Sequence, residues 1–495
     1  MMTRREALDW LASIEGLGIK LGLDNSARLL AALGDPQRAF RSILVGGTNG
    51  KGSVAAMIES ILAAAGHRTG IYTSPHLTRF EERIGVGGRP VSGEEFSAAL
   101  GRVREAAVTL VSSRGATAHP THFEVLTAAA FLIMADRGVE LAVLEVGMGG
   151  RLDATVLAVP LLSVLTNVSL EHTRFLGSDI ASIAREKAGI LPEGGRLLAG
   201  ERHPDALAAF RERAAAVRGR LVELDEWAGL EGTADERPGV SRADAIGVAA
   251  SEGSRGSGSG DAAHAGAVGD PAGASARAAQ GGLTITTGHR RHEGLTLGLR
   301  GNHQRRNALL AVAAVDLLDM MGIAVPAEAV RPGLASARWP GRFQDLGGSP
   351  RLILDGAHNP AACRVLRETM VSEGLEPEAT TLLLGILRDK ELGPMLDELL
   401  PVAGRIVTTR GLSGRFRDPW ALSESVRARG IHVEATDGLD EGLRRAREIT
   451  PAGGTICATG SLYLVGDIMS HLGIDPFAAS GSMENRDRGS SGANR

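Results

Sequence analysis

The stretch Val45–Gly66, VGGTNGKGSVAAMIESILAAAG, decides the fold of this chain. An apolar segment, Ser42–Val45, leads into it and predicts a strand. Apolar residues recur at helical spacing in its second half, at Val54, Met57, Ile58, Ile61 and Leu62. A strand, a glycine-rich loop and a helix together aim several backbone N–H groups at one point in front of the helix. That geometry binds anions, and phosphates above all.

One lysine stands inside the glycine loop. Lys51 supplies a point charge that can follow a β- or γ-phosphate, and Ser53 adds a hydroxyl near a phosphate or a magnesium ion. The loop departs from the standard G-x-x-x-x-G-K-[ST] pattern, because Val45 replaces the first glycine and Gly52 separates the lysine from the serine. We interpret it as a compact variant that binds a nucleoside triphosphate.

Two other interpretations fit the loop less well. Residues 50–55 match the dinucleotide pattern G-x-G-x-x-A, but that pattern requires an acidic residue about 20 positions later. Residues 70–74, GIYTS, contain none. A tight turn without a ligand is the third interpretation, since glycines alone can form one.

Bulk composition excludes several classes of protein. A chain of 495 residues predicts two domains, and 43% hydrophobic residues suffice for their cores. A net charge of −4 gives no support for binding nucleic acid or an acidic membrane. The two cysteines, Cys363 and Cys457, exclude a disulfide scaffold and a four-cysteine zinc site. Neither a signal peptide nor a membrane span is recognisable, so we expect a cytoplasmic protein.

Strand and helix patterns alternate from residue 42 to about 224. Strands are predicted at Ser42–Val45, Thr69–Thr73, Leu141–Val146, Leu161–Asn167 and Leu197–Ala199. The alternation predicts an α/β fold with a P-loop and a mostly parallel sheet covered by helices on both faces. A second, smaller Rossmann-like α/β pattern begins near Phe343. Its strands are expected at Arg351–Leu354, Thr380–Leu384, Arg405–Thr409 and Thr455–Ala458.

The remaining segments set the domain boundaries. We expect an ATP-binding domain over residues 1–339, interrupted at about 231–282 by a Gly-, Ala- and Ser-rich disordered insert. A small β-hairpin, GLTITTG with GLTLGLRG, and a helix, NHQRRNALLAVAAVDLLDMMG, follow the insert. The second domain covers residues 340–475, and residues 476–495 form a disordered tail.

Polar residues follow several of the predicted strands. Glu145 ends one strand, where a parallel sheet with a phosphate loop usually places a magnesium ligand. His172 follows the next strand, and Ser74-Pro75 follows another in a turn that a cis-proline would suit. Lys187 lies in the last turn of a helix expected to begin at Ser178 and end at Gly189, where a cation complements the helix dipole.

The second domain contributes its own candidates. Arg342, near the domain junction, is suited to clamp a phosphate. Asp355 ends a predicted strand, and His358 is expected to begin the next helix.

Eight ordered motifs resemble the Mur-ligase superfamily, in particular its folylpolyglutamate synthase and bifunctional dihydrofolate synthase branch. They span about Leu11 to Leu472 and omit the insert and the tail. In order they are GTNGKGS, TSPH, EVGMGGRLDAT, EHTRFLG, REKAGI, HQRRNA, PGRF and DGAHNP. Two positions depart from the usual pattern: Val156 replaces an Asn, and Glu171 replaces an Asp.

The resemblance implies roles for particular residues. Catalytic roles fall on Lys51, Lys187, His172 and His358. ATP would be bound by Thr48, Asn49, Gly50, Lys51, Gly52, Ser53, Asn307, Arg342 and Asp355. The pterin substrate would contact Thr121, His122, Phe123 and Glu124. Metal would be held by Ser74, Glu145, His172 and a carbamylated Lys187, which replaces the helix-dipole interpretation of that lysine.

The resemblance also implies the reaction. A monomeric ligase would use ATP and two Mg²⁺ ions to convert a pterin carboxylate into an acyl phosphate, which L-glutamate then attacks. Dihydropteroate, tetrahydrofolate polyglutamates or both remain open as substrates. Two alternatives also remain: a Mur-type ligase that acts on a cell-wall precursor, and a P-loop switch protein. Neither accounts for TSPH, THFE and DGAHNP together.

Overall fold

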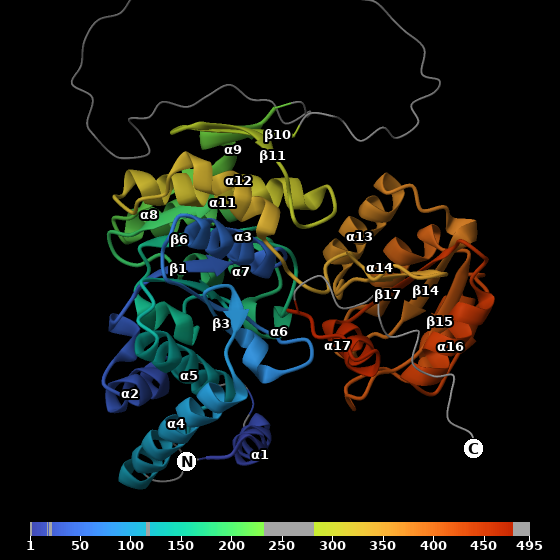
Figure 1. Ribbon diagram of the computed structural model, residues 1–495, viewed down its shortest axis with the longest axis horizontal. Coiled ribbons are helices and arrows are strands. Elements are labelled where there is room, and N and C mark those ends of the chain that lie inside the picture. Colours follow the sequence, from blue (N-terminus) through green and yellow to red (C-terminus); the bar gives the residue numbers. More distant parts are fainter. Residues whose placement is uncertain (1, 17, 19–21, 115–118, 232–281, 479–495) are drawn as a thin grey trace, which may run out of the picture.

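The computed structural model describes residues 2–16, 18, 22–114, 119–231 and 282–478. Most of the predicted 231–282 insert and of the predicted 476–495 tail lies outside these residues. Two α/β domains lie side by side, the larger on the left of Figure 1 and the smaller on the right. No helix in these ranges combines the length and apolar composition that crossing a bilayer requires.

The larger domain is built on an eight-stranded sheet with the order β4-β3-β2-β5-β1-β6-β7-β8. The strands from β2 to β8 in this order are parallel, and β3 and β4 extend the edge in antiparallel fashion. The strands are β1 (Arg41–Gly46), β2 (Thr69–Tyr72), β3 (Ile84–Val86), β4 (Arg89–Pro90), β5 (Leu141–Glu145), β6 (Leu162–Leu165), β7 (Arg196–Ala199) and β8 (Arg220–Glu223).

Helices cover both faces of this sheet, because successive side chains of its strands point to opposite sides. In β1, Leu44 packs into one core while Ile43 and Val45 pack into the other. Helices on the Leu44 side are α1 (Arg4–Glu15), α2 (Asp24–Ala32), α4 (Gly93–Arg114), α5 (His122–Asp136), α7 (Ile180–Ala188) and α8 (Pro204–Ala216). Helices on the other side are α3 (Lys51–Ala64), α9 (Leu224–Trp227), α11 (His303–Met320) and α12 (Ala327–Ser336).

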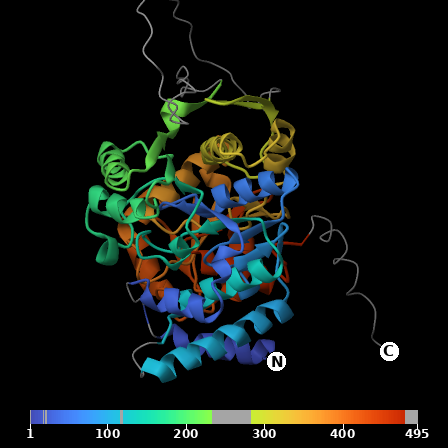
Figure 2. The same ribbon diagram turned by 90° about the vertical axis from the view of Figure 1, so that its left-hand side faces the viewer.

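A three-stranded antiparallel sheet caps the α11 side, at the top of Figures 1 and 2. It consists of β9 (Ala228–Leu230), β10 (Leu283–Thr287) and β11 (Arg291–Leu295). The predicted hairpin exists, but its second strand lies earlier than GLTLGLRG and shares only Gly294 and Leu295 with that segment. A tight turn closed by the Thr287 N–H donating to Arg290 O starts the partner strand at Arg291 instead. Polar His292 is buried in that strand because it pairs with Asp316 of α11 at 3.0 Å.

The smaller domain has a six-stranded sheet with the order β12-β13-β17-β14-β15-β16, in which only β12 is antiparallel. Its strands are β12 (Gln344–Asp345), β13 (Arg351–Leu354), β14 (Thr380–Leu384), β15 (Arg405–Thr408), β16 (Val433–Ala435) and β17 (Thr455–Thr459). One face packs on α13 (Pro360–Ser372), α14 (Leu392–Leu399) and α15 (Pro419–Arg427). The other face packs on α16 (Leu439–Ile449) and α17 (Leu462–His471).

The strand order fixes where a site can form. In the larger domain β2, β5, β1 and β6 are neighbours, so the loops after their carboxyl ends lie side by side. In the smaller domain β13, β17 and β14 are neighbours in the same way. Ligands of such sheets bind outside the carboxyl ends of the strands. The predicted α/β fold with a mostly parallel sheet in each half is confirmed.

Candidate active site

A cavity of about 700 Å³ opens where the two sets of loops face one another. Loops after four neighbouring strands of the larger sheet form one side, and loops after β13, β14 and β17 form the other. Every predicted site residue lines this cavity. They are Thr48, Asn49, Gly50, Lys51, Gly52, Ser53, Ser74, Thr121, His122, Phe123, Glu124, Glu145, His172, Lys187, Asn307, Arg342, Asp355 and His358.

The glycine loop presents a bare helix N-terminus to the cavity. Gly50 is the N-cap of α3 at φ +83°, a conformation that favours glycine, and no side chain caps the helix. The first N–H groups of α3 are therefore available to a ligand. Lys51 Nζ lies 3.0 Å from Thr48 O, so the cation folds back over the loop.

The end of β6 holds this loop in shape. The Asn49 N–H donates to Asn167 Oδ1 at 3.0 Å, and Asn49 O accepts from Thr166 Oγ1 at 2.7 Å and from Asn167 Nδ2 at 3.0 Å. A Cβ on Gly47 would lie 2.0 Å from Thr166 Oγ1, so only glycine fits there. The loop is thus braced before any ligand arrives.

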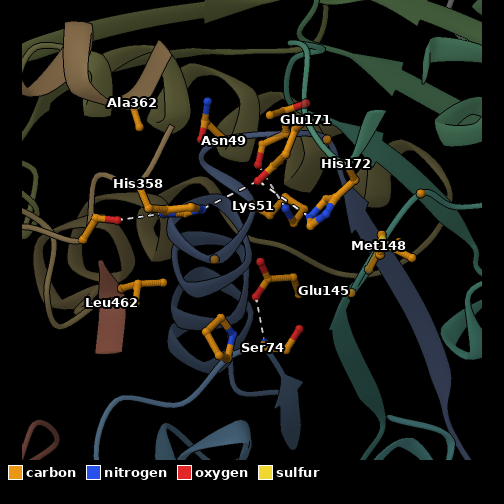
Figure 3. A pocket seen from close by; sticks show the side chains of 18 of the residues that line it. Asn49, Lys51, Ser74, Glu145, Met148, Glu171, His172, His358, Ala362 and Leu462 are labelled. Atoms are coloured by element: carbon orange, nitrogen blue, oxygen red, sulfur yellow. Dashed lines mark hydrogen bonds and ion pairs between the residues drawn. The ribbon is translucent and has the colours of Figure 1, made fainter. Parts of the chain in front are cut away.

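Glu145 and Ser74 meet at the ends of adjacent strands, β5 and β2. The Ser74 N–H donates to a Glu145 carboxylate oxygen at 3.2 Å (Figure 3). The Ser74-Pro75 peptide bond is cis. Glu145 is 5% exposed, and burial raises the pKa of its carboxyl, although Lys51 and Arg342 oppose that rise. A cation placed here would favour the charged form of the carboxylate.

Glu171 lies between two histidines from different domains (Figure 3). It is 3.7 Å from His172 Nε2 and 3.7 Å from His358 Nε2. Burial alone would raise the pKa of Glu171, but His358, Lys51 and His172 outweigh it and hold that pKa far below its usual range. Burial lowers the pKa of His172, while Glu171 opposes that change; the lowered pKa favours the neutral imidazole, which is the form that can act as a ligand.

Lys187 belongs to the last turn of α7, which ends at Gly189 as predicted. The N-cap of this helix is Asp179 rather than Ser178, because the Asp179 carboxylate accepts the Ser182 N–H at 2.8 Å. Lys187 is 3% exposed, and its Nζ donates to Gly47 O of the phosphate loop at 2.6 Å. Burial and the nearby Lys51 lower its pKa to about 7.

Residues 121–124 divide between structure and cavity. Thr121 and Glu124 form a capping box at the start of α5, and Glu124 also accepts from Ser26 Oγ at 2.8 Å. These two side chains are thus occupied by the fold. His122 and Phe123 are only partly buried and line the cavity, and Phe123 packs closely on Gly147.

The predicted ATP residues outside the loop flank it from two sides. Asn307 of α11 faces Gly50, since a Cβ on that glycine would lie 2.9 Å from Asn307 Oδ1. Burial lowers the pKa of Arg342, while Asp355 and Glu145 oppose that change. Asp355 accepts the N–H groups of Phe343 and Ala357, each at 2.9 Å. These bonds orient the Asp355 carboxylate at the domain junction.

The loop after β13 differs from its prediction in one respect. His358 does not begin the helix: α13 starts at Pro360, and Asn359 is its N-cap. The reason is that Asn359 Oδ1 accepts the Ala362 N–H at 2.8 Å, which leaves His358 in the loop before the helix. His358 thereby faces the larger domain.

Comparison with known proteins identifies the family. The model of the Mur ligase middle domain matches residues 45–196, and that of the Mur ligase glutamate ligase domain matches residues 341–462. Dihydrofolate synthase/folylpolyglutamate synthase of Bacillus subtilis is 31% identical over 471 residues, which cover 94% of this chain and 99% of that protein. The chain belongs to the dihydrofolate synthase/folylpolyglutamate synthase family of Mur ligases.

Other members of this Mur-ligase family agree in sequence and structure. Folylpolyglutamate synthase of Mycobacterium tuberculosis, solved with ADP and AMPPCP, superposes with a TM-score of 0.80 at 28% identity, covering 96% of this chain and 100% of that one. The E. coli FolC structure with DHPP and ADP has a TM-score of 0.76 at 29% identity, covering 94% and 97%. The chain spans about half the length of a Haloferax volcanii relative, a probable bifunctional folylpolyglutamate synthase/dihydropteroate synthase, with 35% identity over 94% of this chain.

Three residues to which the sequence analysis gave no role shape this Mur-ligase site. Asp153 is buried and accepts the N–H groups of Gly147 and Met148, so it fixes the glycine turn after β5. Asn167 braces the phosphate loop, and Asn359 caps α13. Asp153 lies within the EVGMGGRLDAT motif, where an acid after a glycine turn was a usable signal. For the two asparagines, the sequence gives no partner.

Proposed function

We propose that this chain is an ATP-dependent ligase that joins L-glutamate to the carboxylate of a pteroate or folate. The observation that carries the proposal is a single cavity with three contributions: an uncapped helix N-terminus with Lys51, the buried acid Glu145, and the second-domain loop that holds Asp355 and His358. A phosphate loop alone would suit many nucleotide-binding proteins. A second domain closing over it suits a reaction that must exclude water.

The reaction has two steps. The substrate carboxylate attacks the γ-phosphorus of ATP, the bond to the bridging oxygen breaks, and ADP leaves. The glutamate amine then attacks the acyl carbon, the bond to phosphate breaks, and phosphate leaves as the nitrogen gives up its proton. Backbone N–H groups of residues 48–53 would hold the phosphates, and Lys51 would meet the charge on the transferred group. Asn307, Arg342 and Asp355 would hold the rest of the nucleotide.

The residues present fit a magnesium site. Among the described residues, no three His, Cys, Asp and Glu side chains gather as a metal cluster. Mg²⁺ suits such a site, because it takes one or two protein oxygens and completes its shell with water and phosphates. We propose that Ser74, Glu145 and His172 hold it, and that it neutralises phosphate charge when bound. A second Mg²⁺ would lie beside Lys187.

We propose that Lys187 is carbamylated. Its amine is buried against Gly47 O, and no carboxylate of the described residues forms an ion pair with it. A buried ammonium without a counter-ion is costly, and the lowered pKa of Lys187 reflects that cost. The neutral amine can add to the carbon of carbon dioxide and release one proton to solvent, which gives an anionic carbamate that can bind a metal.

His358 would accept the proton that the glutamate amine gives up when it attacks the acyl carbon. Its Nδ1 lies 2.8 Å from Gly356 O, a group that can only accept, so Nδ1 carries a hydrogen. Nε2 is then the atom that gains or loses a proton, and Glu171 lies beside it. On the opposite side of the cavity, His122 and Phe123 would contact the pterin.

We also place the domain boundary between residues 339 and 340.

The decisive assay measures ADP release with ATP and L-glutamate while the acceptor is varied among dihydropteroate, tetrahydrofolate and a UDP-sugar peptide. We expect turnover that requires glutamate together with one or both pterins. Turnover on the UDP-sugar peptide would favour the cell-wall alternative. Slow hydrolysis indifferent to glutamate would favour the P-loop switch. Mass spectrometry of the pterin product, heavier by one glutamyl residue, checks that ligation and not hydrolysis is observed.

A further inference from the structure

Two asparagine side chains join the domains inside the cavity wall. Asn359 Nδ2 donates to Asn49 Oδ1 at 3.0 Å, and Asn49 Nδ2 donates to Asn359 Oδ1 at 3.4 Å. The residues are 310 positions apart, one in the phosphate loop and the other at the start of α13. Each amide therefore uses both a donor and an acceptor on the other. We refer to this contact as the amide pair.

Asn49 has little freedom except at this side chain. Its N–H and its carbonyl are both bonded to the end of β6, at Thr166 and Asn167. The backbone of Asn49 therefore stays with the larger domain whatever the smaller domain does. Its side-chain amide is the part that reaches across.

Asn359 has two roles that can be separated. Its Oδ1 caps α13 by accepting the Ala362 N–H at 2.8 Å, and its Nδ2 donates to Asn49. The cap needs only an oxygen, whereas the stronger bond of the amide pair needs the NH₂ group. Asn359 is 7% exposed, so an amide that lost its partner here would lose a bond that water replaces poorly.

The residue before Asn359 reinforces the contact. His358 Nε2 faces Glu171 at 3.7 Å, so two successive residues of one loop contact two different loops of the larger domain. The amide pair is attached to the phosphate loop, and the His358–Glu171 pair is attached to the loop after β6. A loop that contacts both cannot shift without breaking one of them.

We propose that Asn359 is a positioning residue whose amide pair with Asn49 couples closure of the two domains to the shape of the phosphate loop. Closure adds two hydrogen bonds, and fixing the Asn49 side chain fixes the loop that aims its N–H groups at phosphate. Nucleotide binding, by the same linkage, favours closure. The inference rests on the proposed nucleotide function of this cavity.

The test uses variants that keep the cap and remove the donor. Asn359→Ser and Asn359→Asp retain an oxygen for the Ala362 N–H but have no NH₂ group. We expect melting temperatures close to wild type, about tenfold weaker binding of a non-hydrolysable ATP analogue, and a smaller closed population. Closure is measured by energy transfer between dyes on Glu105→Cys of α4 and Glu424→Cys of α15, both exposed. The native cysteines are buried and should stay unlabelled.

The matched control is Asp418→Ser. Asp418 caps α15 through the Ala421 N–H at 2.9 Å and precedes a proline, as Asn359 does, and within the described ranges it forms no hydrogen bond or ion pair with the larger domain. A double variant, Asn49→Ala with Asn359→Ser, should bind the analogue no more weakly than the weaker single variant, because one contact is lost only once.

Two results would overturn the proposal. Wild-type closure and analogue binding in Asn359→Ser would show that the amide pair couples nothing. A fall in melting temperature equal to that of Asp418→Ser, with binding unchanged, would leave Asn359 as a helix cap only. Neither measurement uses glutamate or a pterin, so failure of the ligase assay would not be mistaken for failure of this inference.

Discussion

Two strand–loop–helix units face each other across the cavity, and they end differently. After β1, Gly50 starts α3 with no side-chain cap, so the helix presents open N–H groups. After β13, Asn359 caps α13 and Pro360 occupies its first position, so fewer N–H groups are open there. The same topology therefore gives one helix end suited to an anion and another suited to protein contact.

This difference shows that the capping residue, rather than the fold, determines whether a helix N-terminus binds a ligand or contacts protein. A residue without a side chain leaves the helix dipole and its donors to a ligand. A residue with an amide satisfies one donor and still has an NH₂ group for a neighbour. The first unit can bind phosphate. The second can form hydrogen bonds that require the two domains to be in contact.

The largest effect is expected from Lys51→Ala, which removes the cation from the uncapped unit. We expect kcat to fall by on the order of 10³-fold, because charge on the transferred phosphoryl group loses its partner. ADP release at saturating ATP measures it, with circular dichroism to show that the fold survives. Arg38→Ala, an exposed cation outside the cavity, should leave the rate unchanged. A folded Lys51→Ala enzyme at the wild-type rate would disprove the nucleotide interpretation of the loop.

Next comes Lys187, whose amine contacts Gly47 of the same unit. If it carries a carbamate, Lys187→Ala should lose on the order of 10²-fold in kcat, with partial rescue by a small carboxylate. If Lys187 only complements the helix dipole, Lys187→Ala should lower the free energy of unfolding by at most about 1 kcal/mol. Arg185→Ala, in the same last turn but exposed, is the control for the dipole. A carbon-13 carbamate signal in protein purified with bicarbonate tests the modification directly, and its absence from a fully active enzyme would leave an unmodified lysine.

The capped unit should respond in stability. Asn359→Ala removes both the cap and the amide pair, and we expect about 1 kcal/mol less stability in urea unfolding, followed through the smaller domain. Asn359→Ser should restore most of that stability without restoring nucleotide affinity. If alanine and serine behaved alike in both measurements, the two roles assigned to this side chain would not be separable.

The smallest effect is expected from a deletion between β9 and β10, which alters neither of the two strand–loop–helix units. β9 and β10 are antiparallel neighbours, and the Glu231 N–H donates to Thr284 O at 3.2 Å, so the chain leaves and re-enters this sheet at adjacent points. Deleting residues 234–279 should leave kcat near wild type, because each halving of loop length changes closure free energy by only about 0.6 kcal/mol. Differential scanning calorimetry and the ADP assay measure both effects. A large loss of activity would mean that the segment contributes to the site.

Much of the site could be predicted because its parts are local in sequence. The continuous apolar run Ile43, Leu44 and Val45 is typical of a strand buried on both faces, and the glycines after it predict the phosphate loop. Parallel strands end at a common edge, which explains why Glu145 and His172 could be grouped from their strand positions, whereas Ser74 joined them through the family resemblance. Monomeric state and cytoplasmic location stay predictions.

What the sequence could not supply depends on long-range contacts. Nothing near Asn359 indicates that its partner is Asn49, and nothing near Lys187 indicates that its amine reaches Gly47. The second hairpin strand was misplaced because buried His292 looks like a loop residue until Asp316 is known to lie beneath it. Side chains of this kind are assigned by their partners, which periodicity does not describe.

Burial along α3 has a mechanical consequence. Ten of its residues are buried: Gly52, Ser53, Val54, Ala55, Ala56, Met57, Ile58, Glu59, Ile61 and Leu62. A helix packed on nearly every side is stiff, so the phosphate-binding end cannot travel toward its substrate. Contacts that cross to the smaller domain are of two kinds: ion pairs such as Arg79–Asp475 at 3.0 Å and Arg300–Asp345 at 3.2 Å, and the apolar packing of Leu77 on the core that contains Val465. We therefore expect any movement between the domains to turn the smaller domain relative to a fixed α3, rather than to shift α3 itself.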